Sequence, residues 1–166
     1  MTETQPGRVW LFGDDIDTDQ LAPGRYMRGG IEQLAAHCLE AARPDFAAGV
    51  RPGDILVAGK NFGMGSSREQ AAEALRHLGL AGVVARSFAG IFYRNAINLG
   101  LPVLTAPDLA GVADGDRATL APETGMLRLT EKGIDIPTEP IPENLRGIIA
   151  DGGLVPHLKK RFAAAP

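Results

Sequence analysis

Short apolar runs alternate with helical periodicities through the middle of the chain, and this alternation predicts its main elements. Residues 54–58, 81–86 and 101–104 form runs of apolar and small residues that are typical of buried strands. Residues 67–79 and 87–100 carry apolar side chains at helical spacing. The pattern predicts a strand–helix–strand unit with a right-handed crossover, and Pro102 makes the strand at 101–104 an edge strand.

The flanking segments add further elements of both kinds. We expect a strand at 8–13, an amphipathic helix at 31–42, and a helix at 142–149 followed by a short docking segment at 152–160. Between them, residues 117–120, 125–130 and 133–136 read as short strands separated by turns. The chain is therefore predicted to form one α/β domain over residues 1–166, with a mixed sheet and flanking helices.

A glycine-rich turn connects the strand at 54–58 to the helix that follows it. The turn ends in Ser66, Ser67 and Arg68 at the predicted N-terminus of the helix, where free N–H groups and the helix dipole suit an anion. Ser66 with Glu69, or Ser67 with Gln70, matches a capping box, and Ser87 is the predicted cap of the next helix. One cap does not require two serines, an arginine and three glycines, so this turn is the candidate site.

Two loops before that turn also carry polar side chains. The acidic loop Asp14–Asp19 has two interpretations: local turn chemistry, or a role in shaping the site. The loop at 21–30 is bracketed by Pro-Gly and Gly-Gly, and presents Arg25, Tyr26 and Arg28 either to solvent or to a carboxylate. Cys38 falls on the apolar face of the helix at 31–42 and is predicted to be a core residue.

Composition narrows the classes of function. The 166 residues carry a net charge of −3, which argues against general nucleic-acid binding. We find no apolar run of membrane-spanning length and no signal-peptide core, so we expect a cytoplasmic protein. A single cysteine cannot form an internal disulfide or hold an iron–sulfur cluster by itself, so no cofactor or metal is expected on this chain.

Three stretches, in order, give the sequence a specific resemblance. GDDIDTDQLAPGRYMRG, GKNFGMGSSREQAAEAL and RSFAGIFYRNAINLGLPVL resemble the small subunit of 3-isopropylmalate dehydratase and homoaconitase. That subunit is the separate swivelling domain of the aconitase superfamily, a β/β/α-type domain like the aconitase C-terminal domain. The resemblance covers residues 8–105, with a weaker echo at 152–156.

The resemblance implies a hydro-lyase that acts on a hydroxylated di- or tricarboxylic acid. A large partner subunit would hold a [4Fe-4S] cluster whose open iron binds the substrate, in a heterodimer or a higher oligomer. By similarity, Ser66 is the base that removes the proton next to a carboxylate, and Ser67 and Arg68 bind carboxylate and stabilise the serine alkoxide. Arg28 matches the position of the arginine that selects the substrate and would read a distal carboxylate.

Departures from the family pattern leave several interpretations open. Met64 replaces a cysteine or small residue, and Gln70 replaces the usual histidine after G-S-S-R-E. The sequence around Arg28 matches no signature that we associate with isopropylmalate or homoaconitate. The prediction is the small subunit of 3-isopropylmalate dehydratase, in leucine biosynthesis. Homoaconitase or a methylmalate- or dimethylmalate-type dehydratase is the alternative within the class, and a non-catalytic domain that binds anions or a protein partner is the alternative from another class.

Overall fold

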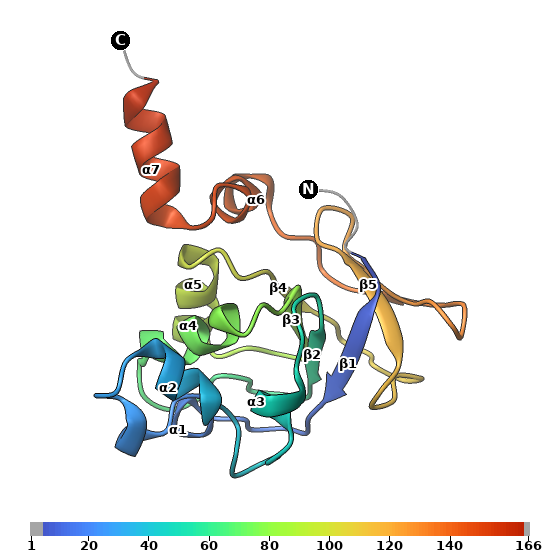
Figure 1. The fold of residues 1–166 in the computed structure, drawn as a ribbon. Helices are drawn as coiled ribbons and strands as arrows, with labels where there is room; N and C mark the ends of the chain where they lie inside the picture. Colours follow the sequence, from blue (N-terminus) through green and yellow to red (C-terminus); the bar gives the residue numbers. More distant parts are fainter. Residues whose placement is uncertain (1–4, 165–166) are drawn as a thin grey trace.

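A seven-stranded mixed sheet organises the chain (Figure 1). The structure is a computed structural model, and it describes residues 5–164. The strand order is β4-β3-β2-β1-β5-β6-β7; β1 to β4 run parallel, and β5 to β7 continue the sheet antiparallel. The strands are β1 (Gly7–Leu11), β2 (Ile55–Ala58), β3 (Gly82–Ala85), β4 (Val103–Thr105), β5 (Arg117–Ala121), β6 (Met126–Leu129) and β7 (Ile134–Pro137).

Helices form the crossovers of the parallel half and extend the chain at its end. Two nine-residue helices connect β2 to β3 and β3 to β4, as the apolar runs predicted, and β4 lies at the edge of the sheet. The C-terminal helix stands away from the sheet in Figure 1. The helices are α1 (Thr18–Leu21), η1 (Gly24–Tyr26), α2 (Ile31–Ala36), α3 (Phe46–Gly49), α4 (Glu69–His77), α5 (Gly90–Asn98), α6 (Glu143–Ala150) and α7 (Leu154–Ala163).

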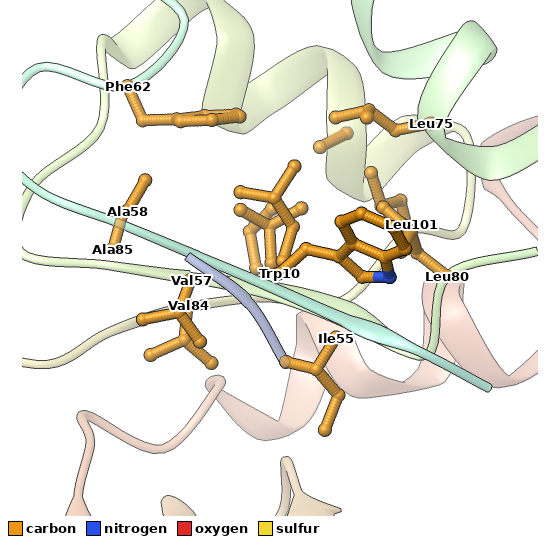
Figure 2. Close-up of a cluster of buried hydrophobic side chains, with 14 of the residues drawn as sticks. Trp10, Ile55, Val57, Ala58, Phe62, Leu75, Leu80, Val84, Ala85 and Leu101 are labelled. Atoms are coloured by element: carbon orange, nitrogen blue, oxygen red, sulfur yellow. The ribbon is translucent and has the colours of Figure 1, made fainter. Parts of the chain in front are cut away.

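The main core surrounds the central parallel strands. All four residues of β2 and of β3 are buried, because helices or loops cover both faces of these strands. Figure 2 shows the result: Phe62 and Leu75 lie on one side of the strands, and Val57 and Val84 lie on the other. Trp10 of β1 packs edge-on against Phe46 of α3 with ring centroids 5.3 Å apart. These contacts fix the strand ends from which the candidate site is built.

Two of the sequence predictions about helix ends are wrong in α2 and α5. The helix expected at 31–42 ends at Ala36, because the chain turns and Leu39 takes the left-handed backbone conformation with φ 60°. The Leu39 N–H then donates to Gln20 O at 2.8 Å, so a tertiary contact replaces a further helical turn. Ser87 does not cap α5, since the helix begins at Gly90 and the Ser87 hydroxyl accepts from Asn61 N–H at 2.8 Å.

A group of hydrogen bonds and ion pairs around Asp114 joins the loop before β5 to the end of β1 and to the turn before α3. Arg43 donates to Asp114 Oδ2 from Nη2 at 2.9 Å, and the Leu11 N–H donates to Oδ1 at 2.9 Å. The hydrogen bond from Arg43 lowers the pKa of Asp114 to about 2. Because the pKa is below the unfolded value of about 3.9, the stabilisation is present above pH 4 and is lost as the pH falls toward 2.

We therefore predict that Asp114→Asn lowers the free energy of unfolding by about 1 kcal/mol at pH 7, a value discounted for partial solvent exposure. The variant should also lose less stability than the wild type between pH 4 and pH 2. Urea unfolding at several pH values measures both effects. Asp135→Asn is the control, because Asp135 pairs with Arg128 on an exposed surface and should change stability by less than about 0.5 kcal/mol. Equal pH dependence in Asp114→Asn and wild type would contradict the assignment.

Candidate functional site

The loops that follow β1 and β2 form one side of the candidate site. Because the two strands are parallel neighbours, both loops leave the sheet at the same edge, which is where ligands bind in open α/β sheets. The loops remain hydrogen-bonded beyond the strands. Successive backbone bonds join Gly59 N–H to Gly13 O (3.0 Å), Asp15 N–H to Lys60 O (2.8 Å), Gly63 N–H to Ile16 O (2.7 Å) and Thr18 N–H to Met64 O (2.9 Å).

The acidic loop performs both of the roles left open by the sequence. Its turn chemistry is a capping box, in which Asp17 Oδ1 accepts from the Gln20 N–H at 2.8 Å and opens α1. It also shapes the glycine-rich turn, since Asp14 accepts from Lys60 N–H at 2.7 Å and Asp15 accepts from the Asn61 amide at 3.0 Å. The acidic side chains are therefore committed to protein contacts.

The turn Ser66–Arg68 precedes helix α4 and leaves both serines exposed. The predicted capping boxes are wrong: Arg68 is the N-cap residue, and no side chain within residues 5–164 caps the helix. A tight turn from Arg68 N–H to Ser66 O at 2.8 Å holds the serines ahead of the helix. Of the first-turn N–H groups of α4, that of Ala71 donates to Arg68 O at 3.1 Å. Those of Glu69 and Gln70 make no hydrogen bond within residues 5–164 and lie at the same place as two hydroxyls and a guanidinium.

Glycine is required at two positions of this turn. Gly63 has φ 84°, and a Cβ there would lie 2.3 Å from the side chain of Phe92 on α5. Gly65 has φ 105°, and a Cβ there would lie 3.1 Å from Thr18 Oγ1. Both positions combine a left-handed backbone with close packing, so a side chain would displace the turn that carries Ser66.

The side chain of Arg68 is oriented by helix α1 and the residue that follows this helix. Its Nη1 donates to Asp19 Oδ1 at 2.8 Å and to Ala22 O at 3.0 Å, and the side chain is 28% exposed. The hydrogen bond from Arg68 lowers the pKa of Asp19, so the carboxylate stays charged. One terminal nitrogen is thus fixed by protein oxygens, while the other donors of the planar guanidinium make no hydrogen bond within residues 5–164 and have a geometry that suits an anion.

The loop with Arg28 is exposed, as predicted, and is anchored by its neighbours. Arg25 Nη2 donates to Glu40 at 3.1 Å, and the Tyr26 ring stacks on His37 with centroids 3.6 Å apart. His37 Nδ1 also lies 2.6 Å from Glu40 Oε2. Arg28 itself is exposed and makes no hydrogen bond or ion pair within the described part of the chain. The structure therefore brings Ser66, Ser67 and Arg68 together and gives Arg28 no fixed contact with them.

The single cysteine lies in the core, as predicted. Cys38 has no exposed surface, and burial raises the pKa of its thiol. A buried protonated thiol is unsuited to ligate a metal. Across residues 5–164 we find no group of three or more acidic, histidine or cysteine side chains that could hold a metal ion. The residues at this site therefore do not fit an iron–sulfur cluster.

Sequence reasoning did not identify Thr18 and Asp19 as members of the site. Both stand in the acidic loop Asp14–Asp19, for which the sequence left open local turn chemistry or a role in shaping the site, and neither was named as a site residue. The available signal was a hydroxyl next to a carboxylate in the segment that follows β1, the strand that pairs with β2. Their distance of almost fifty positions from Ser66 and Arg68 hid the connection.

Comparison with known proteins agrees with the geometry. The model of the aconitase C-terminal domain matches residues 40–108. The chain is 53% identical to 3-isopropylmalate dehydratase small subunit 2 of Archaeoglobus fulgidus, covering 93% of this chain and 94% of that protein. It is 50% identical to the methanogen homoaconitase small subunit of Methanothermobacter thermautotrophicus, covering 93% and 90%.

A solved structure also matches this chain over nearly its full length. The crystal structure of 3-isopropylmalate dehydratase from Methanocaldococcus jannaschii superposes with a TM-score of 0.92 and 43% identity, covering 98% of this chain and 96% of that one. The fold and the glycine-rich turn together define an aconitase C-terminal-type α/β domain. The chain belongs to the aconitase C-terminal domain family, with the small subunits of the hydro-lyases 3-isopropylmalate dehydratase and homoaconitase. In the described range, no helix has the length and apolar character needed to cross a membrane.

Proposed function

We propose that this chain is the small subunit of a heteromeric 3-isopropylmalate dehydratase, a hydro-lyase of leucine biosynthesis. The observation that carries the proposal is the turn Ser66–Arg68, which presents two exposed hydroxyls beside an arginine held by Asp19 and Ala22. Several curated relatives at about 50% identity are named as small subunits of this enzyme. The name small subunit supports a complex with a large subunit.

Ser66 is proposed as the base of the reaction. In the dehydration, the C–H bond next to a substrate carboxylate breaks and its proton passes to Ser66 Oγ. The electron pair of that bond forms the C=C bond as the hydroxyl group leaves the neighbouring carbon as hydroxide. Return of the proton from Ser66 to that hydroxide, through solvent, gives water and restores the base. A serine oxygen is a useful base only where its anion is stabilised, and the N–H groups of α4 and the Arg68 guanidinium provide that stabilisation.

Ser67 and Arg68 are proposed to hold the carboxylate of the substrate. Ser67 is exposed next to Ser66, so its hydroxyl and the free donors of Arg68 can bind the same carboxylate. Asp19 keeps Arg68 in one orientation, which reduces the freedom lost on binding. The bound carboxylate then places the adjacent C–H bond toward Ser66.

The remaining half of the site is proposed to come from the large subunit. Since Cys38 is buried in the core, a [4Fe-4S] cluster would be bound by the partner, where it supplies Lewis-acid chemistry to the substrate. The cytoplasm suits such thiolate ligands, because thiols stay reduced there. The chain described here contributes the base and the carboxylate-binding groups.

Arg28 is proposed to bind the distal carboxylate of the substrate, because its exposed guanidinium makes no hydrogen bond or ion pair among residues 5–164. We predict that Arg28→Ala, in the complex reconstituted with its large subunit and cluster, raises KM for the preferred acid roughly 10- to 100-fold with a smaller change in kcat. Isopropylmalate, homocitrate, citrate, citramalate and methylated malates form the screen. The isopropylmalate reaction is expected to be the fastest.

Arg25→Ala is the matched control, because the Arg25 guanidinium already binds Glu40. It should change KM less than threefold. Fastest turnover of homocitrate would favour homoaconitase, which the 50% identity to a homoaconitase small subunit makes the second candidate. Turnover that is unaffected by Arg28→Ala would move substrate selection to other residues. An assembled complex with no turnover of any acid would overturn the proposed function in favour of a non-catalytic binding domain.

A further inference from the structure

Thr18 approaches the proposed base from a different part of the chain. It opens α1 and is 3% exposed, yet its Oγ1 lies 3.3 Å from Oγ of the exposed Ser66. Either hydroxyl can donate in this contact. The distance is longer than the usual 2.7–2.8 Å of a hydroxyl pair, and catalytic hydrogen bonds of this length commonly shorten when the substrate is bound.

The backbone holds Thr18 rigidly in this place. The Asp17 capping box fixes the start of α1, and the Thr18 N–H donates to Met64 O at 2.9 Å. A β-branched side chain has few rotamers, so the hydroxyl position follows from the backbone. Gly65 allows the turn to pass so close, because a Cβ there would lie 3.1 Å from Thr18 Oγ1. Ser66, by comparison, is exposed on a turn, and Thr18 Oγ1 is the side-chain partner of its hydroxyl within the described residues.

We infer that Thr18 is a positioning residue for Ser66, whose hydroxyl orients the base and donates a hydrogen bond to Ser66 Oγ when that oxygen is deprotonated. The inference rests on the proposed role of Ser66. A neutral donor in a fixed position stabilises the alkoxide without adding charge to the site. It acts beside Arg68, whose Nη1 is already bound to Asp19 and Ala22. Thr18 therefore supplies a donor that Arg68 does not.

The test compares Thr18→Val with Thr18→Ser in the reconstituted two-subunit enzyme. Valine keeps the shape and removes the hydroxyl, whereas serine keeps the hydroxyl and removes the methyl group. For Thr18→Val we expect kcat to fall roughly 10- to 100-fold with KM changed less than about twofold. Thr18→Ser should retain kcat within about threefold of the wild type, because the donor remains.

The pH profile of kcat separates positioning from a structural role. Removal of the donor should move the limb assigned to the base to higher pH in Thr18→Val and leave it in place in Thr18→Ser. The charged groups nearest to this pair in the chain are Asp17 and Asp19 beside Thr18 and Arg68 and Glu69 beside Ser66, and all four are retained in both variants.

The outcomes distinguish this inference from the proposed function. If Ser66→Ala abolishes turnover while Thr18→Val matches the wild type in kcat and pH profile, the role of Thr18 is wrong and the proposed function stands. Equal loss in Thr18→Val and Thr18→Ser, together with a lower melting temperature in both, would assign Thr18 to structure alone. If Ser66→Ala keeps full turnover, Ser66 is not the base and both ideas fail. Loss in Thr18→Val with recovery in Thr18→Ser would support the inference.

Discussion

Ser66→Ala is expected to lower kcat of the reconstituted enzyme roughly 10²- to 10⁴-fold, the range for removal of a group that transfers a proton in the transition state. Ser66 is exposed on a turn, and its one side-chain contact in the described structure is with Thr18, so little stability should be lost with it. KM should change little, because Ser67 and Arg68 remain to bind the carboxylate. Steady-state kinetics on the purified complex measures kcat and KM separately.

Thr124→Ala is a suitable control for Ser66→Ala. Thr124 carries an exposed hydroxyl on the turn between β5 and β6, where it makes a long contact of 3.5 Å to Ala121 O. Its replacement should leave kcat unchanged. Sedimentation velocity on both variants tests whether the complex still assembles. A Ser66→Ala complex that assembles and keeps more than about a tenth of the turnover would remove Ser66 from the role of base.

Asp54→Ala is expected to cause the largest loss of stability. Asp54 is 6% exposed at the start of β2 and accepts three hydrogen bonds: from Arg8 N–H at 3.0 Å, Trp10 Nε1 at 2.9 Å and Arg51 N–H at 2.9 Å. Alanine would leave these donors without their acceptor, and the Trp10 nitrogen is buried with its ring. We expect the free energy of unfolding to fall by about 3 kcal/mol and the melting temperature by roughly 6–12 °C.

The matched control for Asp54 is Asp45, another aspartate on a turn before a short element. Its side chain is 64% exposed and pairs with Arg43 at 3.1 Å, so Asp45→Ala should cost less than about 0.5 kcal/mol. Urea unfolding followed by tryptophan fluorescence is informative, because Trp10 is the only tryptophan in the sequence and contacts Asp54. Similar losses in the two variants would show that the three hydrogen bonds of Asp54 add little to stability.

Element type was predictable from the sequence wherever the apolar period was continuous. The buried runs became β2, β3 and β4, and the helical periods between them became α4 and α5. Helix ends were less predictable. Ser66, Ser67 and Ser87 all matched capping patterns, yet their helices begin two or three residues later. The Ser66 and Ser87 hydroxyls instead contact Thr18 of α1 and the Asn61 N–H, and no local pattern reports a competing partner from a distant segment.

The sequence by itself determined the succession along the chain of the strands and of helices α2, α4, α5 and α6, the burial of Cys38, and the glycine-rich turn with its serines and arginine. These features depend on local periodicity and on motifs of a few adjacent residues. Only the tertiary structure decided what those residues contact. The Thr18–Ser66 contact, the Arg68–Asp19 pair and the Arg43–Asp114 pair join positions 48, 49 and 71 residues apart. They form because parallel pairing of β1 with β2 brings distant loops to one sheet edge, while the packing of α3 against Trp10 of β1 and the pairing of β5 with β1 bring Arg43 to Asp114.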